Sequence, residues 1–422
     1  MSETQKHTKP NVPNLSGKRE QKEPRVPSAE RETNVGRNVP NLRFPGFEGE
    51  WERINVADLL EFFSTNSLSW DQLEYTRGSL LNLHYGLIHN GLPTQVNLNE
   101  SELPSIKDDY KPKKFTLCEK GDLAFADASE DTNDVGKVIE FVDCAGKEIV
   151  CGLHTIHGRD KRHKTIPGFK GYAFSSKAFH DQIKRIAQGT KIFSISTGNF
   201  EEVSIGIPTS AEQIKLASFL SLIDKRIIIQ NKVIERYESL IKALRHHIIS
   251  SINPVDEVRF SDILSYEQPS RYIVTDTEYS DNKDLTPVLT ANKAFILGYT
   301  DDREGIYRKG PCIILDDFTL DCKIVDFPFK VKSSAIKILT AKSSVNLRYV
   351  YEYLRYLDLN TEEHKRHYIA EIEPMTIELP GKAATDAIAN LFSKLNSRKQ
   401  LAERDLELLK TEKAFFLNTL FI

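Results

Sequence analysis

The chain contains one pattern twice, at residues 203–250 and 375–422. Each copy begins with a short apolar run that ends in a proline, Pro208 or Pro380, and continues into a long helical segment. When the two prolines are superposed, apolar positions coincide in pairs, namely Ala217 with Ala389, Leu220 with Phe392, Ile223 with Leu395, and Ile234 with Leu406. Each copy follows a globular stretch, so the repeated unit is a domain followed by a long helix.

Both helical segments carry apolar residues at alternating spacings of three and four. The first seam is Leu220, Ile223, Ile227, Gln230, Ile234, Tyr237, Ile241, Leu244 and Ile248. The second seam is Phe392, Leu395, Lys399, Ala402, Leu406, Leu409, Lys413, Phe416 and Leu420. This spacing is typical of the a and d positions of a coiled coil. We expect the two helices, each about 60 Å long, to pack on each other, the alternative being that each covers only its own domain.

Polar residues interrupt both seams. Gln230 lies near the middle of the first helix and Ala402 near the middle of the second. If the helices run antiparallel, these two residues should lie close together. A polar seam residue such as Gln230 fixes the register of the helices. Lys399 and Lys413 weaken the second seam, although their aliphatic stems can cover apolar surface while the charges reach water.

The length of 422 residues predicts two or three domains. We expect a mixed α+β (α/β) fold with two globular heads, two long helices that form an antiparallel coiled coil, and a pseudo-two-fold internal repeat. The predicted divisions are a disordered tail at 1–42, head one at 43–207, the first helix at 208–252, head two at 253–380 and the second helix at 381–422. The tail is polar and proline-rich, which is typical of disorder.

The heads combine short β runs with glycine-rich turns. Strands are expected at 122–126, 137–142 and 192–195 in head one, and at 287–289, 294–297, 312–315 and 335–339 in head two. Helices are expected near 176–187 and 345–357. The two heads also begin alike, because Val56, Asp58, Leu59 and Leu60 align with Phe260, Asp262, Ile263 and Leu264.

Charge is distributed unevenly. The net charge is −3 and the isoelectric point is about 6.4, yet residues 159–193 carry nine Lys or Arg and only two acids. No apolar run is long enough to cross a bilayer and residues 1–9 are polar, so a cytoplasmic location is expected. The five cysteines form no C-x-x-C pair, so we expect reduced, mostly buried thiols and no metal site.

Catalytic signatures are missing from the sequence. There is no phosphate-binding loop, no dinucleotide fingerprint, no nucleophile elbow and no Asn/Asp-Pro-Pro-aromatic motif. The sequence therefore favours a binding protein over an enzyme. Two alternatives remain, a self-contained DNA-modifying enzyme with an unfamiliar site and a coiled-coil adaptor that binds protein.

Three stretches of the chain resemble the specificity (S) subunit of type I restriction–modification systems. They are V-P-N-L-R-F-P-G-F-E-G-E-W at 39–51, I-G-I-P-T-S-A-E-Q-I-K-L-A-S-F-L-S-L-I-D-K-R-I at 205–227, and P-V-L-T-A-N-K-A-F-I-L-G-Y-T at 287–300 with the residues that follow it up to 335. The resemblance covers the chain from about residue 39 onward. The P-x-x-x-E-Q motif before a coiled-coil helix is its most specific element.

This resemblance implies a function in DNA recognition. Each head would be a target recognition domain for one half of a split double-stranded DNA target, and the coiled coil would set the spacing. The chain would dock two modification (methyltransferase) subunits and also restriction subunits. S-adenosylmethionine and ATP would be bound by those partners, and the chain itself would hold no cofactor or metal and would take part in DNA methylation without catalysing it.

Candidate DNA-binding residues follow from cations for phosphates and directional donors for base edges. In head one they are Arg159, Lys161, Arg162, Lys164 and Lys170, with His154, Thr155, His157 and Tyr172 as further candidates. In head two they are Asn292, Lys293, Tyr299, Arg303, Tyr307, Arg308, Lys309, Lys330 and Lys332. A solvated basic loop is the alternative in both heads.

The P-x-x-x-E-Q motif supplies a candidate docking site. Glu212 and Gln213 are the predicted contacts with a modification subunit. The second repeat has Ala384 and Thr385 at these positions. We therefore expect the two docking contacts to differ.

Overall fold

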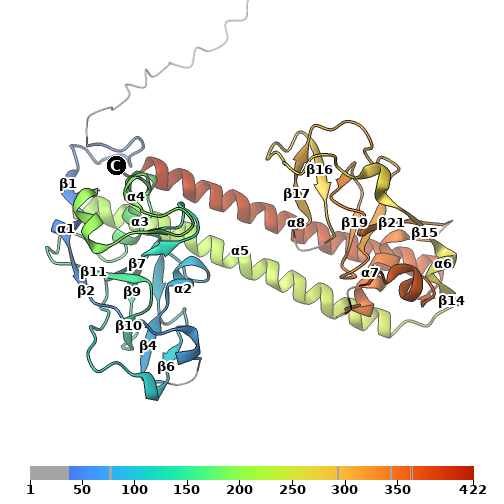
Figure 1. The fold of residues 1–422 in the computed structure, drawn as a ribbon, viewed down its shortest axis with the longest axis horizontal. Coiled ribbons are helices and arrows are strands. Elements are labelled where there is room, and N and C mark those ends of the chain that lie inside the picture. The colour runs from blue at the N-terminus through green and yellow to red at the C-terminus, as the bar shows by residue number, and fades with distance from the viewer. Residues whose placement is uncertain (1–37, 76–77, 292–293, 343–344, 362, 364) are drawn as a thin grey trace, which may run out of the picture.

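Two mixed α/β heads lie at opposite ends of a pair of long helices (Figure 1). This computed structural model describes residues 38–75, 78–291, 294–342, 345–361, 363 and 365–422. The helices are α5 (Ser210–Ser250) and α8 (Lys382–Thr419). In the view of Figure 1, head one hangs below one end of the pair and head two stands above the other end. A half turn in the plane of the picture would exchange the heads, as a pseudo-two-fold repeat requires.

The two helices run antiparallel and contact each other along their length. Contacts between them fall in reverse order, with Phe219 against Phe416 at 4.8 Å between ring centroids, Gln230 against Ala402, and Glu238 against Lys399. The side-chain Nε2 of Gln230 donates to the carbonyl oxygen of Ala402 at 2.9 Å. The predicted antiparallel coiled coil and the predicted proximity of these two residues are therefore confirmed.

The predicted seams form the contact between the helices. All nine seam positions of α5 and all nine of α8 are buried or half-buried. The two seam lysines of α8 find acids on α5, because Lys399 pairs with Glu238 at 2.8 Å and Lys413 pairs with Asp224 at 2.7 Å. Burial opposes the charge of Lys399, but Glu238 and Glu403 raise its pKa. Each lysine is thus held in the seam by a charge on or beside the partner helix.

The heads begin and end with the same elements. Head one opens with β1 (Glu52–Asn55), α1 (Val56–Leu59) and β2 (Leu60–Phe63), and head two opens with β14 (Asp256–Arg259), α6 (Phe260–Ile263) and β15 (Leu264–Glu267). The strand before each long helix returns to the opening strand, as β13 (Ser204–Ile207) pairs antiparallel with β1 and β22 (Thr376–Leu379) with β14. The repeat found in the sequence is therefore a repeat of structure.

Head one contains two sheets of different size. The larger has the order β2-β11-β7-β9-β5 and the smaller has the order β10-β4-β6-β3. The further strands are β3 (Leu73–Glu74), β4 (Leu80–Leu83), β5 (Gln95–Asn97), β6 (Ser105–Ile106), β7 (Leu123–Ala126), β9 (Val138–Asp143), β10 (Glu148–Cys151) and β11 (Thr155–Asp160), with a separate pair β8 (Ala128–Ser129) and β12 (Phe193–Ser194). The helices are α2 (Tyr85–His89), α3 (Lys170–Phe174) and α4 (Lys177–Ile186), with 3-10 turns η1 (Trp70–Gln72), η2 (Asp108–Tyr110) and η3 (Thr197–Glu202).

Head two also contains two sheets, with the orders β15-β21-β18-β19 and β17-β16-β20. Its further strands are β16 (Thr286–Leu289), β17 (Ile296–Thr300), β18 (Cys312–Asp316), β19 (Cys322–Val325), β20 (Lys330–Val331) and β21 (Ile336–Ala341). Its helices are α7 (Leu347–Leu357), a 3-10 turn η4 (Pro269–Tyr272) and a π turn η5 (Tyr368–Ile372). Helix α7 lies between the sheet and the coiled coil (Figure 1).

Each long helix contributes to the core of both heads. The C-terminal residues return to head one, where Phe421 packs against Trp51 and Phe169 at centroid distances of 6.2 and 6.0 Å. Ile249 at the end of α5 and Ala389 near the start of α8 belong to the core of head two. Neither head is therefore closed by its own segment of chain alone.

Most of the expected elements are present, with three differences. Strand β11 is not among the expected strands, and it pairs with a neighbour on both sides. Strand β17 starts two residues later than expected and runs to Thr300. Residues 38–42, assigned to the tail, are structured, since the amide of Leu42 donates to the carbonyl of Thr419. Among the described residues, no helix combines the length and the apolar character that a membrane span requires.

Candidate nucleic-acid interface

Three of the predicted DNA contacts of head one, Thr155, His157 and Arg159, lie in a strand that is paired on both sides. Residues 155–160 are strand β11, which pairs with β2 on one side and β7 on the other. Thr155 and His157 are therefore buried, with 4% and 1% of their surface exposed. Because both side chains are buried, neither Thr155 nor His157 can contact DNA as predicted.

Arg159 also has an internal partner. Its guanidinium donates two hydrogen bonds to the carboxylate of Asp122, at 2.8 and 2.7 Å, and His157 lies 2.7 Å from the same carboxylate through Nε2. Burial opposes ionisation of Asp122, but the hydrogen bonds from Arg159 and His157 lower its pKa. Arg159 thus neutralises a buried acid that lies 37 positions away in the chain.

Lys170 and Tyr172 are buried side chains of helix α3 in head one. Lys170 pairs with the fully buried Glu140 at 3.2 Å, and burial raises the pKa of Glu140. The hydroxyl of Tyr172 donates to Asp224 of α5 at 2.8 Å, while Lys413 of α8 pairs with the other oxygen of that carboxylate. These two predicted DNA contacts are therefore wrong, because Lys170 pairs with a buried acid inside head one and Tyr172 ties the head to the long helices.

The remaining cations of the stretch are exposed or half-buried. Lys161 and Arg162 are exposed, and Lys164 pairs with Glu52 of β1. Exposed His154 lies 3.0 Å from Asp127 and edge-on to the ring of Tyr85. These residues keep surface that a DNA backbone could reach.

The sequence reading missed a basic and aromatic surface at the far end of head one. Loop 107–122 follows β6, and its stretch Y-K-P-K-K-F at 110–115 is exposed except for a half-buried proline. The loop is anchored beside η1, since Lys107 donates to the carbonyl of Asp71 at 2.5 Å. We call this the tip surface, and its members are Trp70, Tyr75, Tyr110, Lys111, Lys113, Lys114 and Phe115.

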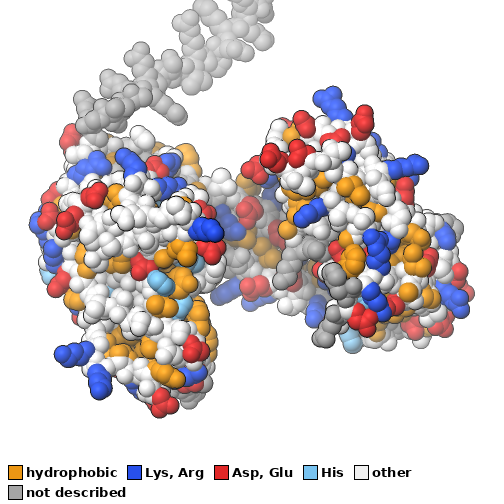
Figure 2. Space-filling model, viewed as in Figure 1, with side chains coloured by type: hydrophobic (Ala, Val, Ile, Leu, Met, Phe, Trp, Pro, Cys, Tyr) orange, Lys and Arg blue, Asp and Glu red, His pale blue; other side chains and the backbone are white. Residues whose placement is uncertain are grey.

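The tip surface has the chemistry of a nucleic-acid contact. Its four aromatic side chains are between 45% and 57% exposed, and three lysines lie among them. Lysines supply phosphate contacts, and exposed rings can stack on bases or sugars. Figure 2 shows Lys and Arg side chains projecting from the lower edge of head one. The three lysines between Tyr110 and Phe115 are the signal in the sequence that could have revealed this surface.

In head two, the structure separates the predicted residues into two groups. Tyr307 and Lys330 are buried, and Lys330 pairs with Asp302 at 2.5 Å, so neither can contact DNA as predicted. Arg303, Arg308, Lys309 and Lys332 are exposed, and Tyr299 is half-buried. Arg303 and Arg308 line one surface hollow of about 560 Å³. Asn292 and Lys293 lie outside the described residues.

Glu212 and Gln213 are not available for docking as predicted. Each is 1% exposed. Glu212 pairs with Arg43 at 2.7 Å, and Gln213 accepts from the amide of Ile166 and donates to the carbonyls of Lys164 and Pro208. The motif therefore ties the start of α5 to head one. In the second repeat, Thr385 makes the equivalent bond to the carbonyl of Pro380.

The coiled coil also carries exposed apolar side chains outside the seam between its helices. Exposed apolar side chains recur at seven-residue intervals on each helix, and we call these residues together the outer stripe: Leu222 and Ile229 on α5, and Leu401, Leu408 and Phe415 on α8. Ile229 and Leu401 are equivalent positions of the repeat, with the same offset as Pro208 and Pro380. Apolar residues in this heptad spacing are typical of a surface that another helix covers.

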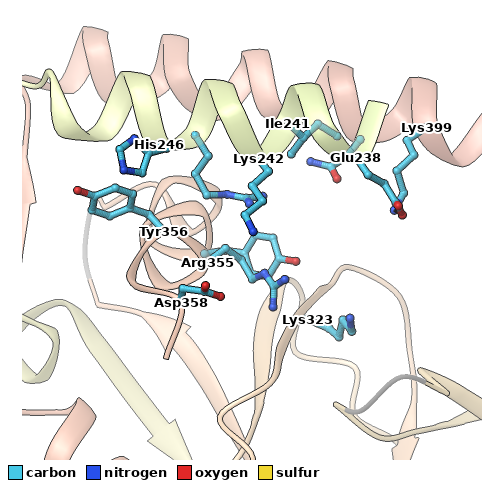
Figure 3. A pocket seen from close by; sticks show the side chains of 12 residues that line it. Glu238, Ile241, Lys242, His246, Lys323, Arg355, Tyr356, Asp358 and Lys399 are labelled. Atoms are coloured by element: carbon cyan, nitrogen blue, oxygen red, sulfur yellow. The ribbon is translucent and has the colours of Figure 1, made fainter. Parts of the chain in front are cut away.

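A cationic pocket of about 430 Å³ lies between the coiled coil and α7 (Figure 3). Its cations include Lys242, Arg355 and Lys323, and Figure 3 shows Lys242 directed from α5 toward Arg355. Acidic Glu238 and Asp358 also line it. The pocket can attract an anionic group, and nothing in its lining arranges a nucleophile and a base among the described side chains.

The fold defines a class of protein with two similar heads at opposite ends of an antiparallel helix pair. Residues 49–238 match the family model of the "Type I restriction modification DNA specificity domain". The Escherichia coli "Type I restriction enzyme EcoR124I/EcoR124II specificity subunit" is 44% identical over 132 residues, which are 30% of this chain and 32% of that protein. The chain thus aligns with about a third of this curated relative.

Solved structures agree with this class. The S subunit of a type I restriction–modification system from M. genitalium superposes with a TM-score of 0.58 at 14% identity, over 91% of this chain and 99% of that one. A chain from a type I R-M system studied for complex assembly and conformational transition gives a TM-score of 0.50 at 13% identity, over 90% and 98%. These matches establish the fold, and the family model and the curated relative show that part of the chain is similar to type I restriction–modification specificity subunits.

Proposed function

We propose that this protein is the DNA-sequence specificity subunit of a type I restriction–modification complex. The observation that carries the proposal is the antiparallel coiled coil with a similar head at each end, joined to the specificity-domain match over head one and most of α5. Two heads on one stiff spacer suit a target with two separated half-sites. Each head would recognise one half-site of double-stranded DNA.

The DNA-contacting residues would be the exposed cations and rings of both heads. In head one these are the tip surface together with His154, Lys161, Arg162 and Lys164. In head two they are Tyr299, Arg303, Arg308, Lys309 and Lys332. Lysines on phosphates would supply salt-dependent affinity, while an arginine bidentate to guanine would supply about 1–3 kcal/mol of discrimination.

The outer stripe would receive the partner subunits. It offers apolar side chains in a heptad spacing on both helices, which fits helices of two modification (methyltransferase) subunits. The stripe differs between the helices, since α8 contributes three residues and α5 contributes two. The two docking contacts would therefore differ. The two repeats also differ at the P-x-x-x-E-Q motif, where Glu212 and Gln213 correspond to Ala384 and Thr385.

Catalysis would belong to the partners. The modification subunits would bind S-adenosylmethionine and methylate adenine, and restriction subunits would use ATP to translocate and cleave DNA. The chain would choose the target without changing it chemically. A purified chain that methylates or cleaves DNA alone would instead favour a self-contained enzyme.

Sequencing of methylated adenines tests this proposal. The chain is co-expressed with its cognate modification subunits in a host that lacks other adenine methyltransferases. We expect methylation at one split sequence, in which two short half-sites are separated by a fixed number of unspecified bases. The control is the same host with the modification subunits alone. Methylation that ignores the presence of this chain, or a target without two halves, would contradict the proposal.

A further inference from the structure

Two cysteines and a histidine meet in the interior of head one. The Sγ atoms of Cys118 and Cys151 and one ring nitrogen of His157 all lie within 4.8 Å of one another. The three side chains are 5%, 2% and 1% exposed. Cys151 ends β10 and His157 lies in β11, while Cys118 belongs to loop 107–122, so the fold brings together residues from three separate segments.

We propose that Cys118, Cys151 and His157 bind a structural zinc ion. Thiolate sulfur and imidazole nitrogen are the ligands that zinc takes in structural sites, with bonds of about 2.3 Å to sulfur and about 2.0 Å to nitrogen. Two thiolates on one tetrahedral zinc ion lie about 3.7 Å apart. The two sulfur atoms here lie 3.5 Å apart, which is close to that spacing and far from the 2.05 Å or so of a disulfide.

The histidine supplies a second, independent observation. Nε2 of His157 is held by the carboxylate of Asp122 at 2.7 Å. Nδ1 is buried and has no hydrogen-bond partner among the described residues. A buried ring nitrogen without a partner costs free energy, whereas a metal ion would satisfy it. Since Nε2 is occupied, Nδ1 is the nitrogen left for the metal.

Asp122 and Arg159 complete the surroundings of the site. Metal-bound histidines commonly donate their other ring N–H to a carboxylate, which fixes the tautomer and the ring orientation. Here Asp122 accepts from His157 and is in turn clamped by two hydrogen bonds from Arg159. Asp122 is thus a positioning residue, and Arg159 balances its charge.

The charges also favour a divalent cation. A Zn²⁺ ion with two thiolates and a neutral imidazole carries no net charge, so it can be buried without a large desolvation cost. The pair of Asp122 and Arg159 beside it is neutral as well. Water can complete the tetrahedral shell. The spacing of these residues along the chain, 33 and 6 residues, matches no zinc motif, which explains why the sequence predicted no metal site.

The site would hold the tip surface in place. Cys118 lies three residues after Phe115 in loop 107–122. A zinc ion would fasten this exposed loop to the two buried strand segments at 151 and 157. The proposal goes beyond the function proposed above, because metal binding can be measured without DNA and would stand even if the tip surface bound something else.

Metal analysis of the purified full chain tests the proposal. We expect one zinc per chain after purification without chelators. In the apoprotein, Co²⁺ should give sulfur-to-metal charge-transfer bands and the strong visible bands of a tetrahedral site. Cys151→Ser should remove the charge-transfer bands and weaken Co²⁺ binding at least tenfold. Cys312→Ser, which changes an equally buried thiol in head two, should leave both unchanged.

A measurement on the unmutated chain tests the zinc site even if a variant fails to fold. X-ray absorption at the zinc edge should show two sulfur neighbours at about 2.3 Å and at least one nitrogen. Asp122→Asn should weaken metal affinity by about 10- to 100-fold while the sulfur bands persist. A native chain that takes up no Zn²⁺ or Co²⁺, a zinc shell without sulfur, or a native Cys118–Cys151 disulfide would overturn the proposal.

Discussion

The side-chain amide of Gln230 donates a hydrogen bond of 2.9 Å to the main-chain carbonyl of Ala402, across the two long helices. The two residues are 172 positions apart in the chain and belong to equivalent helices of the repeat. A polar group inside an apolar seam fixes the register, because a shifted helix would leave it without a partner. This bond therefore marks the centre of the spacer.

A crosslinking experiment tests the register. With cysteines at positions 230 and 402, we expect a short thiol crosslinker to join α5 to α8, detected by mass spectrometry of the linked peptides. The control pair 230 and 389 should not react, since position 389 lies thirteen residues away along α8, or about 20 Å. Equal crosslinking of both pairs would contradict the antiparallel register.

The length of the spacer should set the distance between half-sites. Seven residues inserted between Ile229 and Gln230, and seven between Ala402 and Glu403, preserve both seams and lengthen the coil by about 10 Å. The methylated target should keep both half-sequences and gain about three base pairs between them. Changed half-sequences at the old spacing would show that the coil does not act as a ruler.

The ion pair of Asp224 with Lys413, between head one and the coiled coil, should contribute to the free energy of unfolding. Lys413→Met keeps the aliphatic stem but leaves Asp224 with only the hydroxyl of Tyr172. We expect the free energy of unfolding to fall by about 2 kcal/mol, because a largely buried carboxylate loses its cation. Lys410→Met, which removes an exposed pair with Glu407, should change it by less than about 0.5 kcal/mol. Denaturant titration compares the two variants.

Loss of the C-terminal aromatic anchor should destabilise head one. Phe421→Ala removes a buried ring that packs against Trp51 and Phe169, and we expect a cost of about 3 kcal/mol. Phe415→Ala, at an exposed position of α8, should cost less than about 0.5 kcal/mol. Hydrogen exchange should show faster opening in β1 and β13 for Phe421→Ala, and a uniform change across both heads would count against the contact.

The tip surface should contribute to DNA affinity through charge. In the complex with modification subunits, Lys113→Ala with Lys114→Ala should weaken binding and reduce the slope of log K against log salt by about 1.8. The charge-matched control is Lys177→Ala with Lys184→Ala on α4, away from the tip, and it should leave the slope within error. Salt titrations of binding to a fluorescent duplex measure both.

The sequence predicted the repeated and regular parts of the molecule well. The heptad seams, the shared β-α-β openings at Val56 and Phe260, and helix α4 depend on local periodicity and capping, which a sequence displays directly. The register of Gln230 against Ala402 followed from the symmetry of the two repeats. These features need no knowledge of distant contacts.

The DNA-contact residues were predicted less well, since charge in a sequence does not reveal burial. Arg159, Lys170 and Lys330 each face an acid that is distant in the chain, namely Asp122, Glu140 and Asp302. The alternation of Thr155, His157 and Arg159 was in fact the alternation of a buried strand, with polar side chains on one face. Glu212 and Gln213 are likewise polar in sequence but buried in the structure, and their partners, Arg43 and Ile166, lie in other segments.

The return of Phe421 to the core of head one has a consequence for biosynthesis. Strand β1 of that domain leaves the ribosome long before Leu420 and Phe421, yet the hydrophobic interior of head one stays open until these two residues arrive. Head two needs only the start of α8 to close, so it can mature earlier. A chain terminated before Leu420 would therefore carry an unfinished head one with an exposed apolar core, which makes it a substrate for quality-control proteases.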